Sequence, residues 1–234
     1  MKAAVLVFPG SNREGDVAQA IELVTGRKPQ MVWHGDGDFA KTDLIVVPGG
    51  FSYGDYLRPG AIARFSPLME AVAEFARAGG PVLGICNGFQ VLCEAHLLPG
   101  ALLPNTGLRF LFRQVDVEVE NARTPFTRAC AREDLLSIPV KHTTGRYYAP
   151  DEELDRMEES GQVVLRYAPG QNPNGSIRDI AGITNAEGNV MGLMPHPEHA
   201  VDPLRGPITL RQRDLERLRA ALENRPQLQE VLGI

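Results

Sequence analysis

The sequence predicts an α/β fold, in which a doubly wound and mostly parallel sheet carries helices on both faces and gains antiparallel additions in its second half. In the first half of the chain, short apolar runs rich in β-branched residues alternate with helical patterns, and parallel neighbours need such helical crossovers. In the second half, residues 114–120 alternate valines with polar residues, as a strand with one solvated face does. Because no linker or internal repeat interrupts the 234 residues, we expect a single domain over residues 1–234.

The individual elements follow in order from these patterns. Strands are expected at residues 3–8, 29–33, 44–47, 82–85, 114–120, 163–167, 180–185 and 190–194. Helices are expected at residues 16–24, 67–78 and 210–222, where apolar side chains recur at helical spacing. The acidic run at residues 151–159 predicts a solvated helix face rather than a binding site.

Composition excludes several classes of protein. A hydrophobic fraction of 43% with 23% charged residues is typical of a compact globular chain rather than a disordered or fibrous one. The net charge is −5 and the basic residues are scattered, so the sequence has no cluster of positive charge that nucleic acid could bind. Three cysteines are too few for a disulfide framework, and no apolar stretch reaches the roughly 18 residues of a membrane span. We therefore expect a cytoplasmic protein that binds neither nucleic acid nor a membrane.

The segment GICNGFQ, residues 84–90, carries the strongest chemical signal. A Gly-x-nucleophile-x-Gly pattern after a strand is typical of a nucleophile elbow, which projects the central side chain, here Cys86. At a helix N-terminus the thiolate is favoured, and the N–H of Asn87 can point at an oxygen beside the sulfur. The alternative is a buried, inert cysteine, which is our interpretation of Cys93 and Cys130. No nearby Cys or His pair gives Cys93 zinc-ligand spacing, so we expect no metal.

A base for this thiol is predicted in the segment MPHPEH, residues 194–199. The prolines on both sides of His196 favour an extended backbone, which puts His196 and Glu198 on the same side of the chain. A carboxylate on one imidazole nitrogen would fix the tautomer and leave the other nitrogen for the sulfur. In such a chain His199 faces away. For a lone histidine, an incidental side chain on a surface turn is the alternative. The remaining histidines lack a comparable partner and are interpreted as structural or unassigned: His34, His96 and His142.

A glycine pair follows another of the expected strands, in the sequence Pro48-Gly49-Gly50. Active sites of open α/β sheets gather at the carboxyl ends of strands. Three such ends carry Cys86, His196 and the glycine pair, so we expect them to meet. Gly49 and Gly50 could then supply a second oxyanion donor.

Together, VVPGG, GICNGFQ and MPHPE resemble the class I, triad-type glutamine amidotransferases, which have a flavodoxin-like sheet. Within that family, the segments GGFSYGDYLRPGA (residues 49–61), NPNGS (172–176) and GNVMGLMPHPE (188–198) are similar to glutaminase subunits of purine biosynthesis. The resemblance implies that Cys86 is the nucleophile, His196 the acid and base, and Glu198 its orienting partner.

The same resemblance implies roles around the triad and a partner for the chain. Gly50 and Asn87 would bind the oxyanion through their backbone, with Gly49 beside them, and Gln90 would help to frame the glutamine pocket. Glutamine would be hydrolysed to glutamate and ammonia through a γ-glutamyl thioester. The chain itself would need no cofactor and shows no Walker phosphate loop. A large synthetase partner would use ATP and Mg²⁺ to convert phosphoribosylformylglycinamide to the amidine, often with a small third subunit.

Two departures from the family pattern concern loops rather than the triad. Arg13 stands where a cysteine is expected, and residues 142–145 read His-Thr-Thr-Gly where His-Gly-Glu-Gly is usual. Two other functions stay open on the residues alone. One is another cysteine hydrolase on the same scaffold, such as a peptidase or a γ-glutamyl hydrolase. The other is a non-catalytic subunit that only docks.

Overall fold

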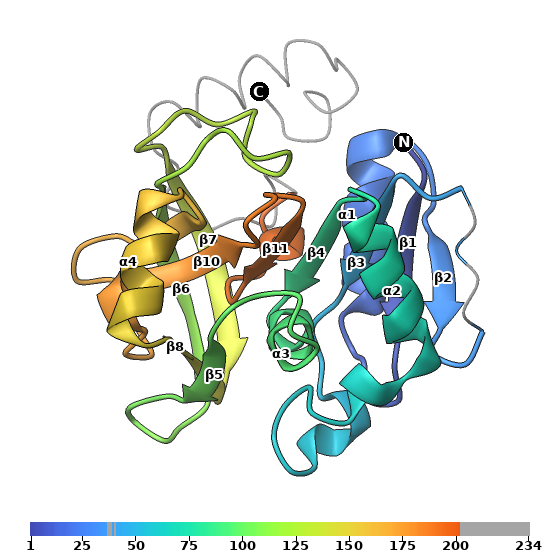
Figure 1. Ribbon diagram of the computed structural model, residues 1–234, viewed down its shortest axis with the longest axis horizontal. Helices are drawn as coiled ribbons and strands as arrows, with labels where there is room; N and C mark the ends of the chain where they lie inside the picture. Colours follow the sequence, from blue (N-terminus) through green and yellow to red (C-terminus); the bar gives the residue numbers. More distant parts are fainter. Residues whose placement is uncertain (37–38, 40, 202–234) are drawn as a thin grey trace, which may run out of the picture.

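The computed structural model describes residues 1–36, 39 and 41–201 (Figure 1). In this part of the chain, nine strands form one sheet in the order β2-β1-β3-β4-β11-β10-β9-β6-β7, and β5 pairs with β8 separately. The strands are β1 (Ala3–Val7), β2 (Gln30–Trp33), β3 (Leu44–Val47), β4 (Val82–Ile85), β5 (Ala101–Pro104), β6 (Leu111–Val119), β7 (Leu135–His142), β8 (Thr144–Tyr148), β9 (Val163–Tyr167), β10 (Ile180–Thr184) and β11 (Val190–Leu193). The helices are α1 (Glu14–Thr25), α2 (Pro67–Arg77), α3 (Asn87–Glu94) and α4 (Asp151–Glu159), with short 3-10 turns η1 (Ser52–Asp55), η2 (Ala63–Phe65), η3 (Ile177–Asp179) and η4 (Pro197–His199).

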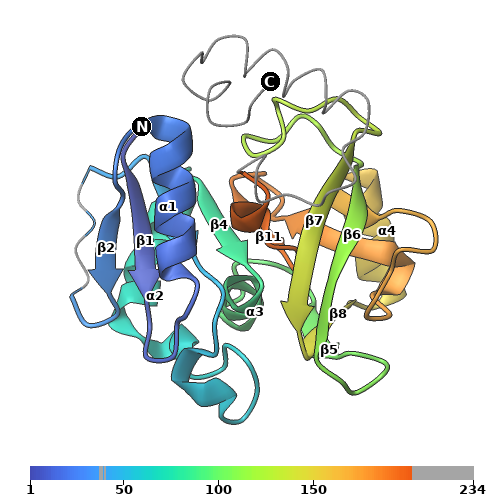
Figure 2. The same ribbon diagram turned by 180° about the vertical axis from the view of Figure 1, so that it is seen from behind.

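Strands β2, β1, β3, β4 and β11 run parallel to one another. Helices α1 and α2 cover opposite faces of this half of the sheet, as the front and back views show (Figures 1 and 2). The strand order is that of a flavodoxin-like sheet. The fold class predicted from the alternation of strands and helices is therefore confirmed.

The other half of the sheet is antiparallel. Strands β10, β9, β6 and β7 follow β11 as successive antiparallel neighbours, which are the additions that the second half of the sequence predicted. Helix α4 spans the acidic run and buries Leu154 and Met157 while its acidic residues stay outside. The interpretation of that run as a solvated helix face is confirmed.

The core runs through both halves of the sheet. Leu6, Ile45 and Val82 are completely buried, which explains why the parallel strands read as continuous apolar runs. Burying one such side chain is worth roughly 1.5–3 kcal/mol, so the sheet is a stable support for the loops at its edges.

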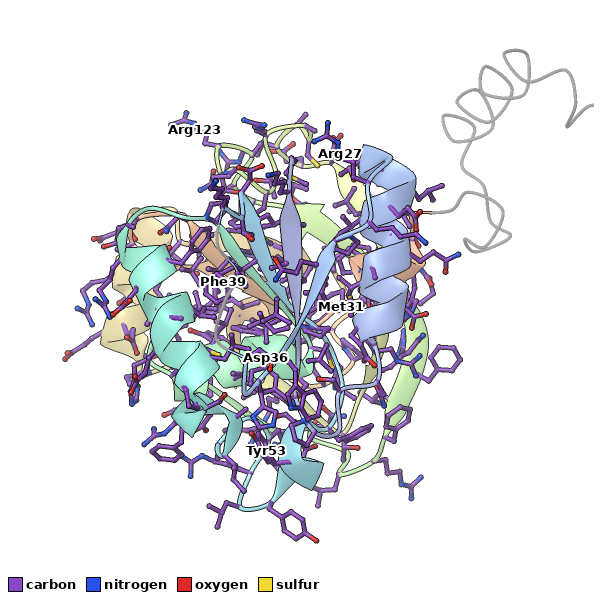
Figure 3. All side chains as sticks on the ribbon, turned by 90° about the vertical axis from the view of Figure 1, so that its right-hand side faces the viewer. Arg27, Met31, Asp36, Phe39, Tyr53 and Arg123 are labelled. Carbon is purple, nitrogen blue, oxygen red and sulfur yellow. The ribbon has the colours of Figure 1, made fainter. Side chains whose placement is uncertain are left out.

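The loops that carry the predicted site lie at one edge of this sheet. Strands β1, β3, β4 and β11 end at the lower edge in Figure 1, where the η1 loop also lies. In the side view, Tyr53 of η1 lies at the lower end of the molecule and Arg123 at the upper end (Figure 3). The loop after β1 meets the glycine pair after β3, because Ser11 forms an antiparallel bridge with Gly50. Among the described residues, no helix is long and apolar enough to cross a membrane.

Three strands were not predicted. β5, β7 and β8 contain prolines or glycines and lack a clean alternation of apolar and polar residues, so their sequences do not read as strands. The expected helix at residues 210–222 lies outside the described residues.

Candidate active site

Cys86 occupies the sharp turn between β4 and α3. Its backbone has φ 52° and ψ −104°, a conformation that is rare for a residue with a side chain and costs energy. The turn is held because the Cys86 N–H donates to the Leu193 carbonyl at 2.8 Å. A methyl group at Gly88 would overlap the Val47 carbonyl, and one at Gly84 would meet the backbone of Gly88. The two glycines therefore let α3 approach the sheet, and the sharp strand-to-helix turn predicted at Cys86 is present.

Cys86 is only 6% exposed, and its thiol faces the end of β7. Its sulfur lies 3.7 Å from the carbonyl oxygen of Lys141, to which the thiol can donate weakly. Asn87 is the first residue of α3, so its N–H has no acceptor within the helix. An N–H at this position is suited to bind an oxyanion next to the sulfur.

His196 and Glu198 form a buried pair. The Nδ1 atom of His196 lies 2.6 Å from Oε1 of Glu198, and both side chains are 2% exposed. Because a carboxylate accepts, Nδ1 carries the proton and Nε2 is the free position. Nε2 of His196 is buried and makes no hydrogen bond of standard geometry. The bond from Nδ1 therefore fixes the orientation of the imidazole and leaves Nε2 as the position that can give or take a proton.

Charge around His196 favours its protonated form. Burial alone lowers the pKa of His196, but the sulfur of Cys86 and the carboxylate of Glu198 outweigh it and raise the pKa to about 10. Cys86 and His196 also line the same small cavity, and Nε2 makes no hydrogen bond of standard geometry to the sulfur. Such contacts are often long in unliganded active sites and shorten when substrate binds. Cys86, His196 and Glu198 thus come together as predicted.

The backbone that joins this pair differs from the expectation. The segment is not extended, because Pro197–His199 forms the 3-10 turn η4. A 3-10 helix has three residues per turn, so His199 returns to the side of His196. The two rings stack at 5.4 Å between their centroids. The expectation that His199 faces away is therefore wrong.

His199 links the His196–Glu198 pair to helix α1. Its Nε2 lies 3.0 Å from Oδ2 of Asp16, and its Nδ1 lies 3.0 Å from Nζ of Lys141.

His196, Glu198 and His199 also have ligand atoms within 4.8 Å of one another, a spacing that could hold a metal ion. The ammonium group of Lys141 beside His199 opposes a further cation there, and the imidazole nitrogens of His199 are already hydrogen-bonded.

A cavity of about 100 Å³ opens onto the reactive groups. The lining residues come from the loops after β1, β3, β4 and β11, from α3, and from the β6 to β8 region. They are Asn12, Arg13, Gly50, Phe51, Asp55, Cys86, Gln90, Phe110, Lys141, His142, Thr143, Thr144 and His196. Of the predicted site residues, Gly50, Cys86, Gln90 and His196 lie in this lining.

The other predicted residues support the cavity from behind. The Asn87 side chain accepts from the Ser52 N–H at 3.1 Å and donates to Oε1 of Gln90 at 2.9 Å. Gln90 in turn donates to the Thr144 carbonyl at 2.5 Å. The carbonyl of Gly49 accepts from the N–H groups of residues 12 and 13. These bonds join the elbow, η1 and the β7–β8 turn into one framework.

Several lining residues were not predicted as site residues. Asp55 lies in the segment GGFSYGDYLRPGA, which carries the family resemblance. Thr143 and Thr144 lie in the 142–145 loop, which departs from the family pattern. Both segments stand out in the sequence, but these three residues were given no role. Lys141 and Phe110 carried no signal in the sequence. Arg13, which replaces an expected cysteine, adds a second cation to the cavity wall.

The chain matches a known protein family and individual relatives. A family model for the CobB/CobQ-like glutamine amidotransferase domain matches residues 1–222. A protein of Rubrobacter xylanophilus, named phosphoribosylformylglycinamidine synthase subunit PurQ, is 59% identical over 206 residues, which cover 88% of this chain and 92% of that protein. A protein of the same name from Streptomyces avermitilis is 54% identical over 212 residues, covering 88% and 90%.

Solved structures give a matching result. A chain in the structure of PurLQS from Thermotoga maritima is similar with a TM-score of 0.80 and 45% identity, covering 88% of this chain and 91% of that chain. A glutamine amidotransferase from Thermotoga maritima has a TM-score of 0.52 at 16% identity, covering 99% of this chain and 86% of that chain, and so shows a shared fold alone.

Proposed function

Because the chain belongs to the CobB/CobQ-like glutamine amidotransferases and is a glutaminase subunit of phosphoribosylformylglycinamidine synthase, we propose that Cys86, His196 and Glu198 are its catalytic triad. The observation that carries this assignment is the state of the His196 ring. Glu198 holds Nδ1, while Nε2 is buried and unbonded, and His196 and Cys86 line the same cavity. This is the arrangement that a cysteine nucleophile needs from its base.

The first half of the proposed reaction forms a thioester and releases ammonia. The sulfur of Cys86 attacks the side-chain carbonyl carbon of glutamine, and the carbonyl π electrons move to oxygen. Backbone N–H groups of Gly50 and Asn87 hold this oxyanion. When the intermediate collapses, the carbon–nitrogen bond breaks and His196 gives its Nε2 proton to the leaving nitrogen. Ammonia and a γ-glutamyl thioester on Cys86 result.

The second half hydrolyses the thioester. His196, now neutral at Nε2, removes a proton from water as the water oxygen attacks the thioester carbon. The carbon–sulfur bond breaks, glutamate leaves, and the thiolate with its imidazolium is restored. Gln90 and Gly49 complete the proposed substrate site, Gln90 from the cavity wall and Gly49 through its bonds to the loop after β1. No step requires a cofactor in this chain.

We also propose the assembly in which the ammonia is used. The relative in the PurLQS structure supports a large synthetase partner and a small third subunit for this chain. ATP and Mg²⁺ would be used by the synthetase. Exposed apolar side chains at the edge that carries the cavity support a docking face there: Phe51, Tyr56, Leu57 and Phe110 are 48%, 74%, 88% and 56% exposed. A single domain over residues 1–234 and a cytoplasmic location stay proposals, the latter supported by three free cysteines.

The triad is tested by replacing its nucleophile in the assembled synthase. Cys86→Ala should abolish amidine synthesis with glutamine as nitrogen donor, while synthesis with ammonium salt as donor continues. Cys93→Ala is the matched control, because Cys93 lies in α3 behind the site and burial raises the pKa of its thiol. Glutamine-dependent synthesis that survives in Cys86→Ala would favour the non-catalytic docking role. Loss of both reactions would indicate misassembly, which the mass of the purified complex detects.

A further inference from the structure

The cavity beside Cys86 contains one carboxylate and two fixed cations. Asp55 is the acidic residue among the described lining residues, and Arg13 and Lys141 are the basic ones apart from histidines. Glutamine carries an ammonium and a carboxylate at the end opposite its side-chain amide. A cavity that takes the amide at Cys86 must therefore meet both charges with the groups on its wall.

Asp55 is held in place rather than free to move with the loop. Tyr53 and Asp55 both have left-handed backbones, with φ 53° and 55°. The loop is fastened by the Tyr53 N–H, which donates to the Pro9 carbonyl at 2.6 Å, and by the Tyr53 hydroxyl, which lies 2.9 Å from Nδ1 of His34. The position of the carboxylate is thus set before substrate binds.

The carboxylate of Asp55 has unused acceptor capacity. A single hydrogen bond is described for it, a long one of 3.4 Å from Nδ2 of Asn87. A carboxylate can accept about four hydrogen bonds, so most of its lone pairs are available to a ligand. Burial raises the pKa of Asp55 to about 6, because the charged form of its carboxylate is poorly solvated. A cationic ligand group would relieve that cost.

The positive residues of the wall cannot take this role. Nζ of Lys141 lies 3.0 Å from Nδ1 of His199, and the guanidinium of Arg13 lies 3.1 Å from Asp16. Both groups repel an ammonium and attract a carboxylate. Of the charged groups on the described wall, Asp55 is the one that a ligand ammonium can approach.

We propose that the Asp55 carboxylate binds the α-ammonium group of glutamine and so selects an amino-acid amide over other carboxamides. This inference rests on the proposed function, since it assumes that the amide end of the substrate lies at Cys86. It assigns Asp55 a role in specificity rather than in bond breaking. The competing explanation is that Asp55 only supports Asn87 and, through it, Gln90.

A substrate analogue separates the two explanations. Glutaramate has the side-chain amide and the carboxylate of glutamine but no α-amino group. In Asp55→Asn the charge is lost while the size is kept, and Asn tolerates a left-handed backbone as well as Asp does. Ammonia release by the full-length chain in its complex with the synthetase would be measured with both substrates. Asp43→Asn is the matched control, because Asp43 is exposed, lies before β3 and accepts from the backbone N–H of Lys2.

The expected result is a selective loss. Because a hydrogen bond to a charged group is worth about 1.5–3 kcal/mol, Asp55→Asn should lower kcat/KM for glutamine about 10- to 100-fold, mostly through KM, and leave glutaramate unchanged within about threefold. The ratio of kcat/KM for glutamine to kcat/KM for glutaramate should fall by the same factor. Asp43→Asn should keep the preference of the unaltered chain.

Two results would overturn the inference. An equal loss with both substrates would show that Asp55 acts on the site through Asn87, and no loss with either would show that it does not contact the ligand. Neither result touches the triad, because Cys86→Ala tests that assignment through a different variant and a different reaction. Failure of the specificity role and failure of the proposed function are therefore distinguishable.

Discussion

His142 makes stability at acid pH a sharp test of how the cavity wall is built. Its ring is 4% exposed, with Nδ1 lying 3.0 Å from Oδ1 of Asn105 and Nε2 lying 3.4 Å from Nδ2 of Asn174. Both amides are oriented by backbone N–H groups, since Gly145 donates to Oδ1 of Asn105 and Ser176 donates to Oδ1 of Asn174. Nδ1 must therefore donate and Nε2 must accept. A proton on Nε2 would face the amide hydrogens of Asn174.

The pKa of His142 gives the size and the sign of the effect. Burial, followed by the positive charge of His196, lowers the pKa of His142 from 6.5 to about 4. The unfolded chain therefore binds a proton at this residue between about pH 6.5 and pH 4, and the folded chain does not. The contribution to the free energy of unfolding is fully present above pH 6.5 and is lost as the pH falls toward 4. At about 1.4 kcal/mol per unit of pKa, the loss is about 3 kcal/mol.

Urea unfolding of the unaltered chain and of His142→Asn, followed from pH 7.5 down to pH 4, measures this loss. Other groups titrate in both proteins and cancel in the difference, so the difference between the two stabilities should shrink by about 3 kcal/mol over this range. Absolute stability is not the readout, because the smaller side chain has its own cost. His96→Asn is the control: His96 is exposed and has a left-handed φ of 56°, which Asn tolerates. The same pH dependence in all three proteins would refute the reasoning.

Two further predictions concern the triad and the docking face. Glu198→Gln keeps an acceptor for His196 but removes the charge, so kcat should fall by a factor of about 10²–10⁴ and the alkaline limb of kcat/KM should move to lower pH. An unmoved limb in the pH–rate profile would contradict the role of the carboxylate charge. Leu57→Asp places a charge on a side chain that is 88% exposed, and it should weaken assembly with the synthetase about 10-fold or more, as measured by titration calorimetry. Val24→Asp is the control, because Val24 in α1 is 72% exposed, and this change should not weaken assembly. Equal effects of the two changes would show that the synthetase docks elsewhere.

The parallel strands could be predicted because their surroundings are uniform. β3 and β4 are buried from both faces, so their sequences are short apolar runs with turn residues at each end, and their bounds match the prediction. β7 lies at the edge of the antiparallel half and includes Pro139, which has no N–H to donate. β7 pairs with β6, and no local sequence pattern predicts this pairing because it joins residues that are far apart in the sequence. The strand that supplies Lys141 and His142 to the cavity was therefore missed.

The residues of the proposed triad could be picked out because they stand in short motifs. Gly84, Cys86 and Gly88 form a local pattern whose geometry is set by the turn itself. For His196 and Glu198 the pairing was right while the backbone was not, since a 3-10 turn also brings the two side chains together. That difference changed the interpretation of His199, because three residues per turn stack it on His196. The two-residue spacing of His196 and Glu198 thus predicted that their side chains meet, but it did not determine the backbone conformation between them.

The electrostatics of the site could not be predicted, because they arise from segments that meet only on folding. Cys86 lies in the turn after β4, His196 precedes η4 and Lys141 belongs to β7, and the charge of the Cys86 sulfur acts to raise the pKa of both other groups. Burial lowers the pKa of Lys141, and the neighbouring charge of Arg13 lowers it further. Arg13, at a position where the family resemblance predicts a cysteine, is also a cation of the cavity wall. If Asp55 binds the ammonium of the substrate, Arg13 and Lys141 are left for its carboxylate, and both charges of glutamine are then matched by fixed groups of the opposite sign.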